Sequence, residues 1–198
     1  MKNMQIGKYS FGTGDRFAHQ GKAQLQALIQ ASQTLGFEIV PVWNKSNREH
    51  TIVYSTPADT REEADNAVEA LGYKGAYFVD ADHINLSNVD KFIEYSDFFT
   101  LDVADFIGEK ALPADIDAFL IKNSKYIGKL YIPGIVTPFN VSEALLWSIA
   151  ERFLYAIQEA GRIYRHIEKS KGEGNFIVEV SMDEVNDAQS PVEMFFIL

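Results

Sequence analysis

Residues 21–43 read "GKAQLQALIQASQTLGFEIVPVW", and this stretch decides the fold class of the chain. Its first part predicts a helix over 21–36, because apolar residues recur at helical intervals at Leu25, Leu28, Ile29 and Leu35. Gly36 is typical of the position just after a helix ends. The apolar run 37–43 then predicts a strand, so a strand directly follows a helix.

The same alternation of strands and helices runs along most of the chain. "GAYFVD" at 75–80 has the near-continuous apolar character of a strand that is buried on both faces of a parallel sheet. Repeated strand–helix units predict an α/β fold with a parallel sheet and right-handed crossovers, in one (β/α) domain over residues 1–198. The predicted strands are 5–12, 37–43, 75–80, 98–102 and 175–180, and the predicted helices are 21–36, 60–72, 87–97 and 142–172, with short helices and a loop over 103–140.

Composition excludes several classes of protein. The net charge of −10 argues against a nucleic-acid partner, because contacts to phosphates need clustered Lys and Arg. The basic cluster at 161–172 is better explained as the cationic end of a long helix. No apolar run approaches the roughly 20 residues that span a bilayer, so no membrane partner is expected. The absence of cysteine fits a reducing cytoplasm and excludes thiolate chemistry.

Two helix starts are predicted from capping patterns. Thr60 and Glu63 form a capping box for the helix over 60–72. At the end of the sequence, Ser190, Pro191 and Glu193 occupy the positions of N-cap, N1 and N3, and apolar residues follow. Because this apolar helix would end within about two turns, we expect a longer polypeptide or a partner that covers it.

Polar side chains gather where the predicted strands end, which is where parallel α/β sheets bind ligands. Strand alternation places Asp80 and Asp82 on one face, Thr100 and Asp102 on one face, and Glu179 and Ser181 on one face. A carboxylate inside an apolar strand is costly unless it is paired or binds a metal, which singles out Glu179. The charged stretches at these ends are "GTGDRF", "NKSNREH", "DADH" and "EVSMDE".

The stretch "PVWNKSNREHTIV" at 41–53 carries seven consecutive polar side chains, from Asn44 to His50. It is either a solvated loop or the lip of an active site. Structural explanations stay open for the other stretches as well. Glu179 could pair with a Lys or Arg of a neighbouring strand, Asp82 could cap a turn, and "GTGDRF" is more consistent with a tight turn than with a dinucleotide site.

No P-loop, nucleophile elbow or H-E-x-x-H motif is present in the sequence. The remaining set of Asp, Glu, His, Lys and Arg residues suits a divalent metal, bound through carboxylate and imidazole groups. It equally suits an acidic substrate with many hydroxyl groups.

Six strings, in this order, resemble the tagaturonate epimerase family: "YSFGTGDRF", "PVWNKSNREH", "YFVDADHI", "SDFFTLDVADFIG", "NFIVEVSMDE" and "SPVEMFFIL". The resemblance implies an enzyme of bacterial hexuronate catabolism that interconverts D-tagaturonate and D-fructuronate. It also implies a (β/α)-barrel-like fold and a divalent metal cofactor. About five (β/α) units are visible, so the resemblance extends to a partial, incomplete TIM-like barrel that matches the front-central part of longer family members.

The implied reaction inverts C4 of a ketose whose carbonyl is at C2. We expect metal-assisted retro-aldol cleavage of the C3–C4 bond or a related proton transfer, because C4 is not adjacent to a carbonyl. Residue type and strand-end position then suggest the roles. The catalytic residues would be Lys45, Asp82 and Asp183, the substrate-binding residues Thr13, Asp15, Arg16, Asn44, Arg48 and His50, and the metal ligands His83 and Glu179.

Three functional hypotheses follow from these residues. The first is a metal-dependent hexuronate epimerase, present as a fragment or shortened homologue. The second is a non-catalytic sugar-acid-binding remnant, or one part of a split enzyme that needs a partner chain. The partners expected beside the substrate are a second copy of the chain, in a homo-oligomer, or a complementing chain that covers the C-terminal end. The third is a different metal-dependent isomerase or aldolase on the same scaffold.

Overall fold

The computed structural model describes residues 4–183 and 188–198, which form two compact units. The first unit comprises Met1–Asp102 and Ile163–Ser181, and the second comprises Val103–Arg162 and Met182–Leu198. The strands are β1 (Ser10–Gly14), β2 (Val40–Ser46), β3 (Phe78–Ile84), β4 (Phe98–Asp102), β5 (Gly128–Leu130), β6 (Phe139–Val141) and β7 (Ile177–Ser181). The helices are α1 (Gly21–Leu35), α2 (Asn47–Val53), α3 (Pro57–Leu71), α4 (Pro113–Asn123), α5 (Glu143–Lys171) and α6 (Pro191–Ile197).

The first unit is built on a parallel sheet with strand order β1-β2-β3-β4-β7. The predicted α/β class, with a parallel (β/α) repeat of five strands, is confirmed. Among the described residues the sheet is open rather than closed into a barrel, and β1 and β7 are its two edges. The carboxyl ends of all five strands meet at one end of this sheet, which is the predicted location of a site.

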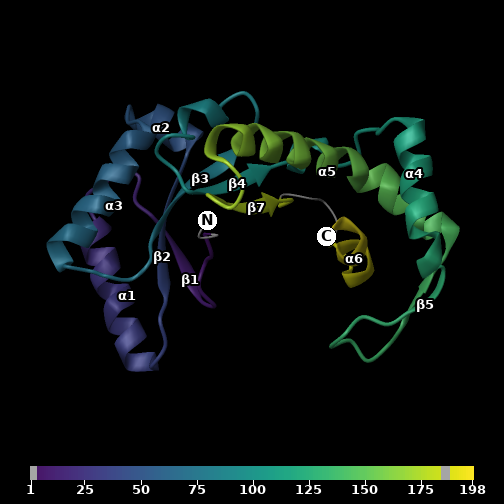
Figure 1. Cartoon of the computed structure of the whole chain (residues 1–198), viewed down its shortest axis with the longest axis horizontal. Helices are drawn as coiled ribbons and strands as arrows, with labels where there is room; N and C mark the ends of the chain where they lie inside the picture. Colours follow the sequence, from purple (N-terminus) through teal and green to yellow (C-terminus); the bar gives the residue numbers. More distant parts are fainter. Residues whose placement is uncertain (1–3, 184–187) are drawn as a thin grey trace. The chain divides into compact units, whose positions relative to one another are not determined.

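The two faces of this sheet are covered differently. Helices α1 and α3 lie together on one face (Figure 1), where Leu25 and Ala64 pack against Trp43 and Val79. On the other face, Val42, Phe78 and Phe98 form a second apolar cluster, and the side chains of Met4 and Ile6 pack against it. Because successive side chains of a strand point to opposite faces, Val42 and Trp43 of β2 belong to different clusters.

The end of β2 differs from the sequence prediction. The strand continues to Ser46, and the residues predicted as a polar connection form helix α2. Ser46 accepts a hydrogen bond from the backbone N–H of Glu49 at 3.2 Å, and the Glu49 carboxylate accepts from the Ser46 N–H at 3.2 Å. The S-N-R-E stretch matches the capping-box pattern, so these polar residues start a helix rather than form a connection.

Helix α3 begins earlier than predicted. Its capping box is formed by Thr56 and Asp59 with Pro57 at the first helical position, rather than by Thr60 and Glu63. Proline favours this start because its φ angle is already helical and its missing N–H would have no partner there. Thr60 is instead buried within the helix, and Glu63 accepts a hydrogen bond from the Gly21 N–H at 2.8 Å.

The helix predicted over 87–97 is reduced to a 3₁₀ turn at Val89–Lys91. Side chains compete with the helical backbone here, since Asn85 accepts from the Ser87 N–H and Asn88 accepts from the Asn85 N–H. The region 103–140 contains α4, as expected, but also the antiparallel pair β5–β6, which was not predicted. Two more 3₁₀ turns occur at Ala104–Phe106 and Ser124–Tyr126.

The second unit packs helices α4 and α6 and the first part of α5 with the β5–β6 pair. Ser190, Pro191 and Glu193 start α6 as predicted, with a complete capping box. The core of the second unit includes Leu146 and Val192, and Phe195 and Phe196 pack against this core. A largely apolar cavity of about 370 Å³ lies between α4, α5 and α6. Within the described residues, no helix is both long and apolar enough to cross a membrane.

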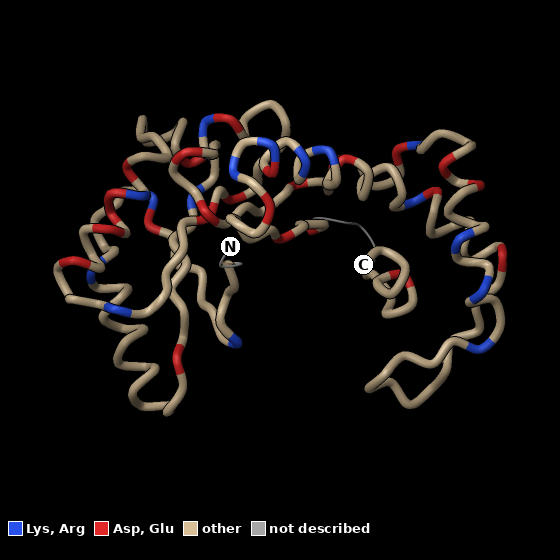
Figure 2. The backbone as a smooth tube through the Cα atoms, in the orientation of Figure 1, with Lys and Arg blue, Asp and Glu red and all other residues tan. Residues whose placement is uncertain are grey.

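Charged residues of both signs are distributed along the chain. Figure 2 shows Lys and Arg residues interspersed with Asp and Glu residues along the chain. The long helix α5 ends with Lys169 and Lys171 in its last turn, as expected for the favourable interaction of cations with the helix dipole.

Candidate active site

A polar pocket of about 170 Å³ lies on the face of the first unit's sheet that α1 and α3 do not cover. Its floor is apolar and includes Val42 and Phe98 of the second apolar cluster. Above this floor, the pocket is lined by polar residues from all five strands of the sheet. These are Ser10 of β1, Asn44 of β2, Asp80, Asp82 and His83 of β3, Thr100 of β4 and Glu179 of β7.

Asn44 is brought to the pocket by two glycines of β1. Gly14 pairs with Asn44 in the sheet, and a Cβ atom on Gly14 would lie 3.1 Å from the Asn44 Oδ1 atom. A Cβ atom on Gly12 would lie 3.7 Å from the Asn44 Nδ2 atom. The glycines of "GTGDRF" therefore make room for an amide side chain. They belong to β1, and the predicted tight turn follows directly, where the Ala18 N–H donates a hydrogen bond to the Asp15 carbonyl at 3.2 Å.

Asp80 is the most deeply buried acid of the pocket, with 6% of its surface exposed. It lies between Asn44 and Phe98 in the sheet register, and its Oδ2 atom accepts a hydrogen bond from the Thr100 hydroxyl at 2.9 Å. Its Oδ1 atom is buried and has no hydrogen-bond partner among the described residues. Such a half-satisfied carboxyl is costly to ionise, which makes it suited to exchange a proton with a ligand.

Burial raises the pKa of Asp80 from 3.8 to about 7. The negative charges of Asp82 and Glu179 act in the same direction, whereas the hydrogen bond from Thr100 opposes them. At neutral pH, both the protonated and the ionised forms of Asp80 are therefore populated. A group of this kind can accept and release a proton without a large energetic penalty.

Replacing Thr100 with valine should raise the pKa of Asp80 further, because the hydroxyl donates its hydrogen bond preferentially to the ionised carboxylate. We expect an upward shift of about one pH unit, the size of one lost hydrogen bond to a charged group. Titration of the Asp80 carboxyl carbon by NMR measures this directly. An unchanged or lowered pKa in the Thr100→Val protein would contradict the assignment of this hydrogen bond.

A bulge in β3 adds a histidine to the pocket. The pairing of β3 with β4 shifts register between Ala81 and Ile84, and His83 adopts a positive φ of 52°. The His83 Nδ1 atom lies 2.7 Å from the Asp82 Oδ1 atom. Regular alternation would direct Asp82 and His83 to opposite faces, whereas the bulge lets both line one pocket. This local irregularity could not be recognised from "DADH" alone.

Glu179 lines the pocket from the edge strand β7, beside Thr100 in the sheet register. The sequence suggested a carboxylate enclosed within an apolar strand. In the structure Glu179 is exposed, because β7 is an edge of the described sheet. The burial cost that singled out Glu179 therefore does not arise within the described part of the chain.

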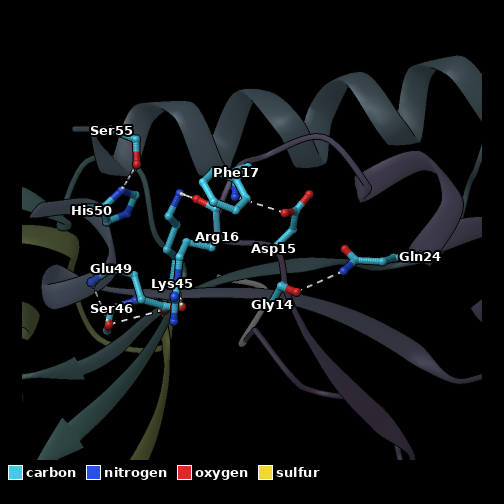
Figure 3. Close-up of polar contacts among 10 residues, drawn as sticks. All are labelled: Gly14, Asp15, Arg16, Phe17, Gln24, Lys45, Ser46, Glu49, His50 and Ser55. Carbon is cyan, nitrogen blue, oxygen red and sulfur yellow. Dashed lines mark hydrogen bonds and ion pairs between the residues drawn. The ribbon is translucent and has the colours of Figure 1, made fainter. Parts of the chain in front are cut away.

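Asp15 lies in the loop that connects β1 to α1, and it organises that loop. Its carboxylate accepts hydrogen bonds from the backbone N–H groups of Phe17, His19 and Gln20 at 3.0, 2.6 and 2.5 Å. Burial alone would raise the pKa of Asp15, but these three donors outweigh it and lower the pKa. Figure 3 shows Asp15 directed back toward its own loop, and the structure thus gives this predicted substrate-binding residue a structural task.

Lys45 was predicted as a catalytic residue, and the structure places it on the helix-covered face of β2. It is 2% exposed, and its ammonium group donates a hydrogen bond to the backbone carbonyl of Arg16 at 2.6 Å (Figure 3). The next residue toward the N-terminus, Asn44, lines the pocket on the opposite face. Lys45 and the pocket carboxylates are therefore separated by the sheet itself.

The other predicted substrate-binding residues lie outside the pocket lining. Arg16 is half-exposed and its Nε atom lies 3.7 Å from the Glu49 Oε1 atom. Arg48 is exposed on α2, and Thr13 donates a hydrogen bond to the Val42 carbonyl at 3.4 Å. His50 is buried, with its Nδ1 atom 2.8 Å from the Ser55 hydroxyl oxygen. Burial, and then the nearby Lys45 charge, lower the pKa of His50 to about 4, so its ring is neutral at pH 7.

Asp183, the third predicted catalytic residue, belongs to the second unit and is not among the residues that line the pocket. Glu184, which follows it in "EVSMDE", lies outside the described residues. The pocket thus unites four predicted residues, Asn44, Asp82, His83 and Glu179, with three polar residues that were not assigned a role, Ser10, Asp80 and Thr100. Strand alternation did place Asp80 beside Asp82, so a signal for it existed.

The pocket residues were also compared with what a metal ion requires. Within residues 4–183 and 188–198, no group of three or more His, Asp or Glu side chains is arranged to hold a metal ion. One Asp82 oxygen is engaged by His83 and one Asp80 oxygen by Thr100. The described residues do not by themselves supply a complete ligand set, and we derive no catalytic step through a metal.

Comparison with known proteins assigns the chain to a family. Residues 2–198 match the family model described as UxaE, tagaturonate epimerase. The chain belongs to the tagaturonate epimerase family. The resemblance seen in the sequence strings is thereby confirmed. Among curated proteins, none matches the sequence of the chain.

Solved structures of fructuronate-tagaturonate epimerase UxaE from Cohnella laeviribosi share the fold. The complex with one glycerol has a TM-score of 0.79 at 20% identity, over 99% of this chain and 41% of that chain. The complex with two glycerols has a TM-score of 0.77 at 21% identity, and the native structure 0.76 at 22%, each over 99% of this chain and 42% of that one. This member of the tagaturonate epimerase family thus spans about two fifths of the length of these relatives.

Proposed function

We propose that this chain carries part or all of the active site of an epimerase that interconverts D-tagaturonate and D-fructuronate. Family membership suggests this pair of substrates. The observation that carries the proposal is the pocket around Asp80, where a buried carboxyl group with a pKa of about 7 lies among amide, hydroxyl and carboxylate side chains. Such groups suit the hydroxyls of a sugar acid and a reaction that moves protons at neutral pH.

The inverted carbon, C4, carries a hydroxyl group and is not adjacent to the C2 ketone. In a retro-aldol route, a base removes the proton of the C4 hydroxyl while the C3–C4 bond breaks. C4 becomes an aldehyde, and the electron pair passes to C3 and is delocalised as an enediolate with the C2 carbonyl. Rotation of the aldehyde and reformation of the bond from its other face give the C4 epimer, and the proton returns to the new hydroxyl.

We assign the proton transfer to Asp80 rather than to Lys45. The Oδ1 atom of Asp80 has no partner among the described residues, so it is available to a substrate hydroxyl. Thr100 holds the other oxygen and so fixes the orientation of the carboxyl group. Asn44 is suited to bind a neighbouring hydroxyl, while Asp82 and His83 form a hydrogen-bonded pair that can orient another.

The carboxylate of the substrate requires positive charge, and the described residues that line the pocket include no Lys or Arg. Arg16 follows β1 by two residues at the carboxyl end of the sheet, and its side chain is 54% exposed. Arginine binds a carboxylate through two parallel hydrogen bonds. We therefore propose that Arg16, and Arg48, which is also exposed, bind the acidic end of the substrate.

A divalent metal stays a prediction of the sequence for this family member. The described residues contain no cluster of three His, Asp or Glu side chains that could hold a metal. If His83 and Glu179 are ligands, the other ligands must therefore be water, substrate or residues outside such a cluster. A metal would supply a Lewis acid for the C2 carbonyl. A location in the cytoplasm, which fits the lack of cysteine, likewise remains a prediction from the sequence.

Incubating the purified chain with D-tagaturonate and Mn²⁺, Ni²⁺ or Zn²⁺ should produce D-fructuronate, which NMR distinguishes from its epimer. Chelation with EDTA tests the predicted metal, since loss of conversion supports a metal cofactor and unchanged conversion contradicts it. Glu179→Gln should weaken metal binding at least about tenfold, as measured by calorimetry. Glu173→Gln, on an exposed residue outside the pocket, is the matched control. Full metal affinity in Glu179→Gln would remove Glu179 from the ligand set.

The alternative proposal is a sugar-acid-binding remnant, or one part of a split enzyme. It is supported by the length of the solved relatives, of which this chain covers 41%. Binding of D-tagaturonate without conversion favours the remnant. Conversion that appears only after addition of a polypeptide equivalent to the unmatched part of those relatives favours the split enzyme. The absence of both binding and conversion under all of these conditions would contradict both proposals.

A further inference from the structure

We infer that Lys45 is a positioning residue, which holds the loop between β1 and α1 through its backbone and thereby sets where the Arg16 guanidinium meets an anionic ligand. The inference rests on the proposed function in one respect, namely that Arg16 binds the carboxylate of the substrate. It assigns to Lys45 an effect on affinity rather than on the chemical step.

The location of Lys45 excludes direct contact with a ligand in the pocket. Its side chain is 2% exposed and emerges from the face of β2 that packs against α1 and α3. Asn44, which precedes it, faces the pocket on the other side. An ammonium group so fully withdrawn from water must be compensated by hydrogen bonds and opposite charge.

The compensation comes from the loop and from two acidic residues of α3. The ammonium group donates to the Arg16 carbonyl at 2.6 Å. Burial raises the pKa of Glu63, and the charge of Lys45 is among the influences that oppose this rise. Asp59 at the start of α3 also interacts electrostatically with Lys45. Figure 3 shows the Lys45 side chain extending to the loop, where its ammonium group contacts the Arg16 carbonyl.

The loop itself is strained and must be held in place. Ala18 has a positive φ of 54°, a conformation in which the Cβ atom of an L-residue comes too close to the following carbonyl oxygen. Asp15 fixes three backbone N–H groups of the loop, and Gln24 donates to the Gly14 carbonyl at 3.1 Å. Lys45 adds the contact at Arg16, between the strand end and the strained residue.

The contact between Lys45 and the loop affects ligand binding through Arg16. Its backbone is held by Lys45, while its Nε atom lies 3.7 Å from the Glu49 carboxylate, which belongs to the capping box of α2. The guanidinium is half-exposed, so an anion can reach it. Because the backbone and one edge of the guanidinium are both positioned, Arg16 loses less conformational entropy when it binds a carboxylate.

The test is a Lys45→Met substitution, which keeps an unbranched side chain and removes the ammonium group. Amide hydrogen exchange of Phe17, His19 and Gln20 should become at least about tenfold faster, since a hydrogen bond from a charged group is lost. The Kd for D-tagaturonate should rise about tenfold, and in the converting protein KM should rise while kcat changes less than about threefold. A large loss of kcat with unchanged KM would overturn the inference.

Two control variants separate this effect from general destabilisation. Lys171 also donates to backbone carbonyls, of Ile93 and Ser96 at 2.8 and 2.7 Å, so Lys171→Met removes similar bonds elsewhere in the first unit. It should leave exchange of the loop amides within about twofold of the wild type. Arg16→Ala keeps the carbonyl that Lys45 contacts, so it should weaken D-tagaturonate binding while the loop amides stay protected.

Hydrogen exchange distinguishes failure of this inference from failure of the proposed function, because it needs no substrate. If no variant, including the wild type, binds D-tagaturonate, the proposed function fails, and the exchange rates still decide whether Lys45 holds the loop. If Lys45→Met does not fold, exchange in the wild type decides. Unprotected amides of Phe17, His19 and Gln20 in the wild type would overturn the inference, and protected amides that open together with Arg16 would support it.

Discussion

Replacing Asp80 with asparagine is expected to stabilise the protein at alkaline pH and to abolish most of its proposed activity. Asp80 is 6% exposed, and burial raises its pKa to about 7. Asparagine has nearly the same shape and carries no charge, and its amide oxygen can still accept the hydrogen bond from Thr100. The energetic cost of ionising a buried carboxyl group therefore disappears in the variant.

The pH dependence of this effect has a defined sign. The folded protein binds a proton at Asp80 more tightly than the unfolded chain does. The pKa of Asp80 is about 7 in the folded protein and near 3.8 in the unfolded chain. Between these two values the folded state holds more protons, so the wild-type free energy of unfolding falls as pH rises. The stability of Asp80→Asn relative to the wild type should thus increase by about 3 kcal/mol between pH 5 and pH 8.

Urea denaturation at a series of pH values measures this difference. Glu173→Gln is the control, because Glu173 is exposed and lies outside the pocket, so water screens its charge effectively. Its relative stability should change by less than about 1 kcal/mol over the same pH range. A pH-independent difference between Asp80→Asn and the wild type would show that Asp80 is already ionised at low pH in the folded state.

The proposed activity should respond to the same substitution in the opposite direction. Asparagine cannot accept the proton of the C4 hydroxyl, so conversion of D-tagaturonate should fall by about 10² to 10⁴-fold. Substrate binding should persist, because the amide can still form hydrogen bonds in the pocket. Retention of more than a tenth of the wild-type rate would transfer the proton-accepting role to another group.

Replacing Trp43 with alanine is expected to produce the largest loss of stability, about 3–5 kcal/mol. Trp43 is 1% exposed and packs between β2, α1 and α3, with its ring at 6.1 Å and perpendicular to that of Tyr77. Removing it leaves a cavity at the centre of this apolar cluster. Because Trp43 immediately precedes Asn44, the pocket should be disturbed as well.

The second tryptophan of the chain provides a matched control. Trp147 is 44% exposed on α5, so Trp147→Ala removes an equal side chain that contributes less to a core. Its effect on the free energy of unfolding should be within about 1 kcal/mol of zero. Urea titrations of both variants make the comparison. Similar losses for the two substitutions would contradict the central position of Trp43 in the first unit.

Most of the elements of the first unit could be predicted from local patterns. The helix over 21–36 and the strand that follows it agree with α1 and β2 to within a few residues at most ends, and the long helix over 142–172 agrees with α5. The errors occurred where polar residues cap their own helices. The S-N-R-E and T-P-A-D stretches start α2 and α3, and in both cases the acidic side chain three residues after the N-cap settles the boundary.

The candidate site was predicted less completely than the fold. Asn44, Asp82, His83 and Glu179 were predicted for the site and line the pocket. Lys45 was grouped with them because it follows Asn44 in a charged stretch. In a strand, however, neighbouring side chains point to opposite faces, and this separates Lys45 from Asn44 once β2 is known to extend to Ser46.

The sequence by itself determined the alternation of strands and helices, the parallel sheet and the family, because these depend on periodicity and on strings of neighbouring residues. Only the tertiary structure decided which polar groups meet. The bulge at Asp82 and His83, the room that Gly12 and Gly14 leave for Asn44, and the burial of Asp80 all depend on strands that are distant in sequence. Burial and register are properties of neighbours across the sheet, and they set the pKa of Asp80 and the orientation of Lys45.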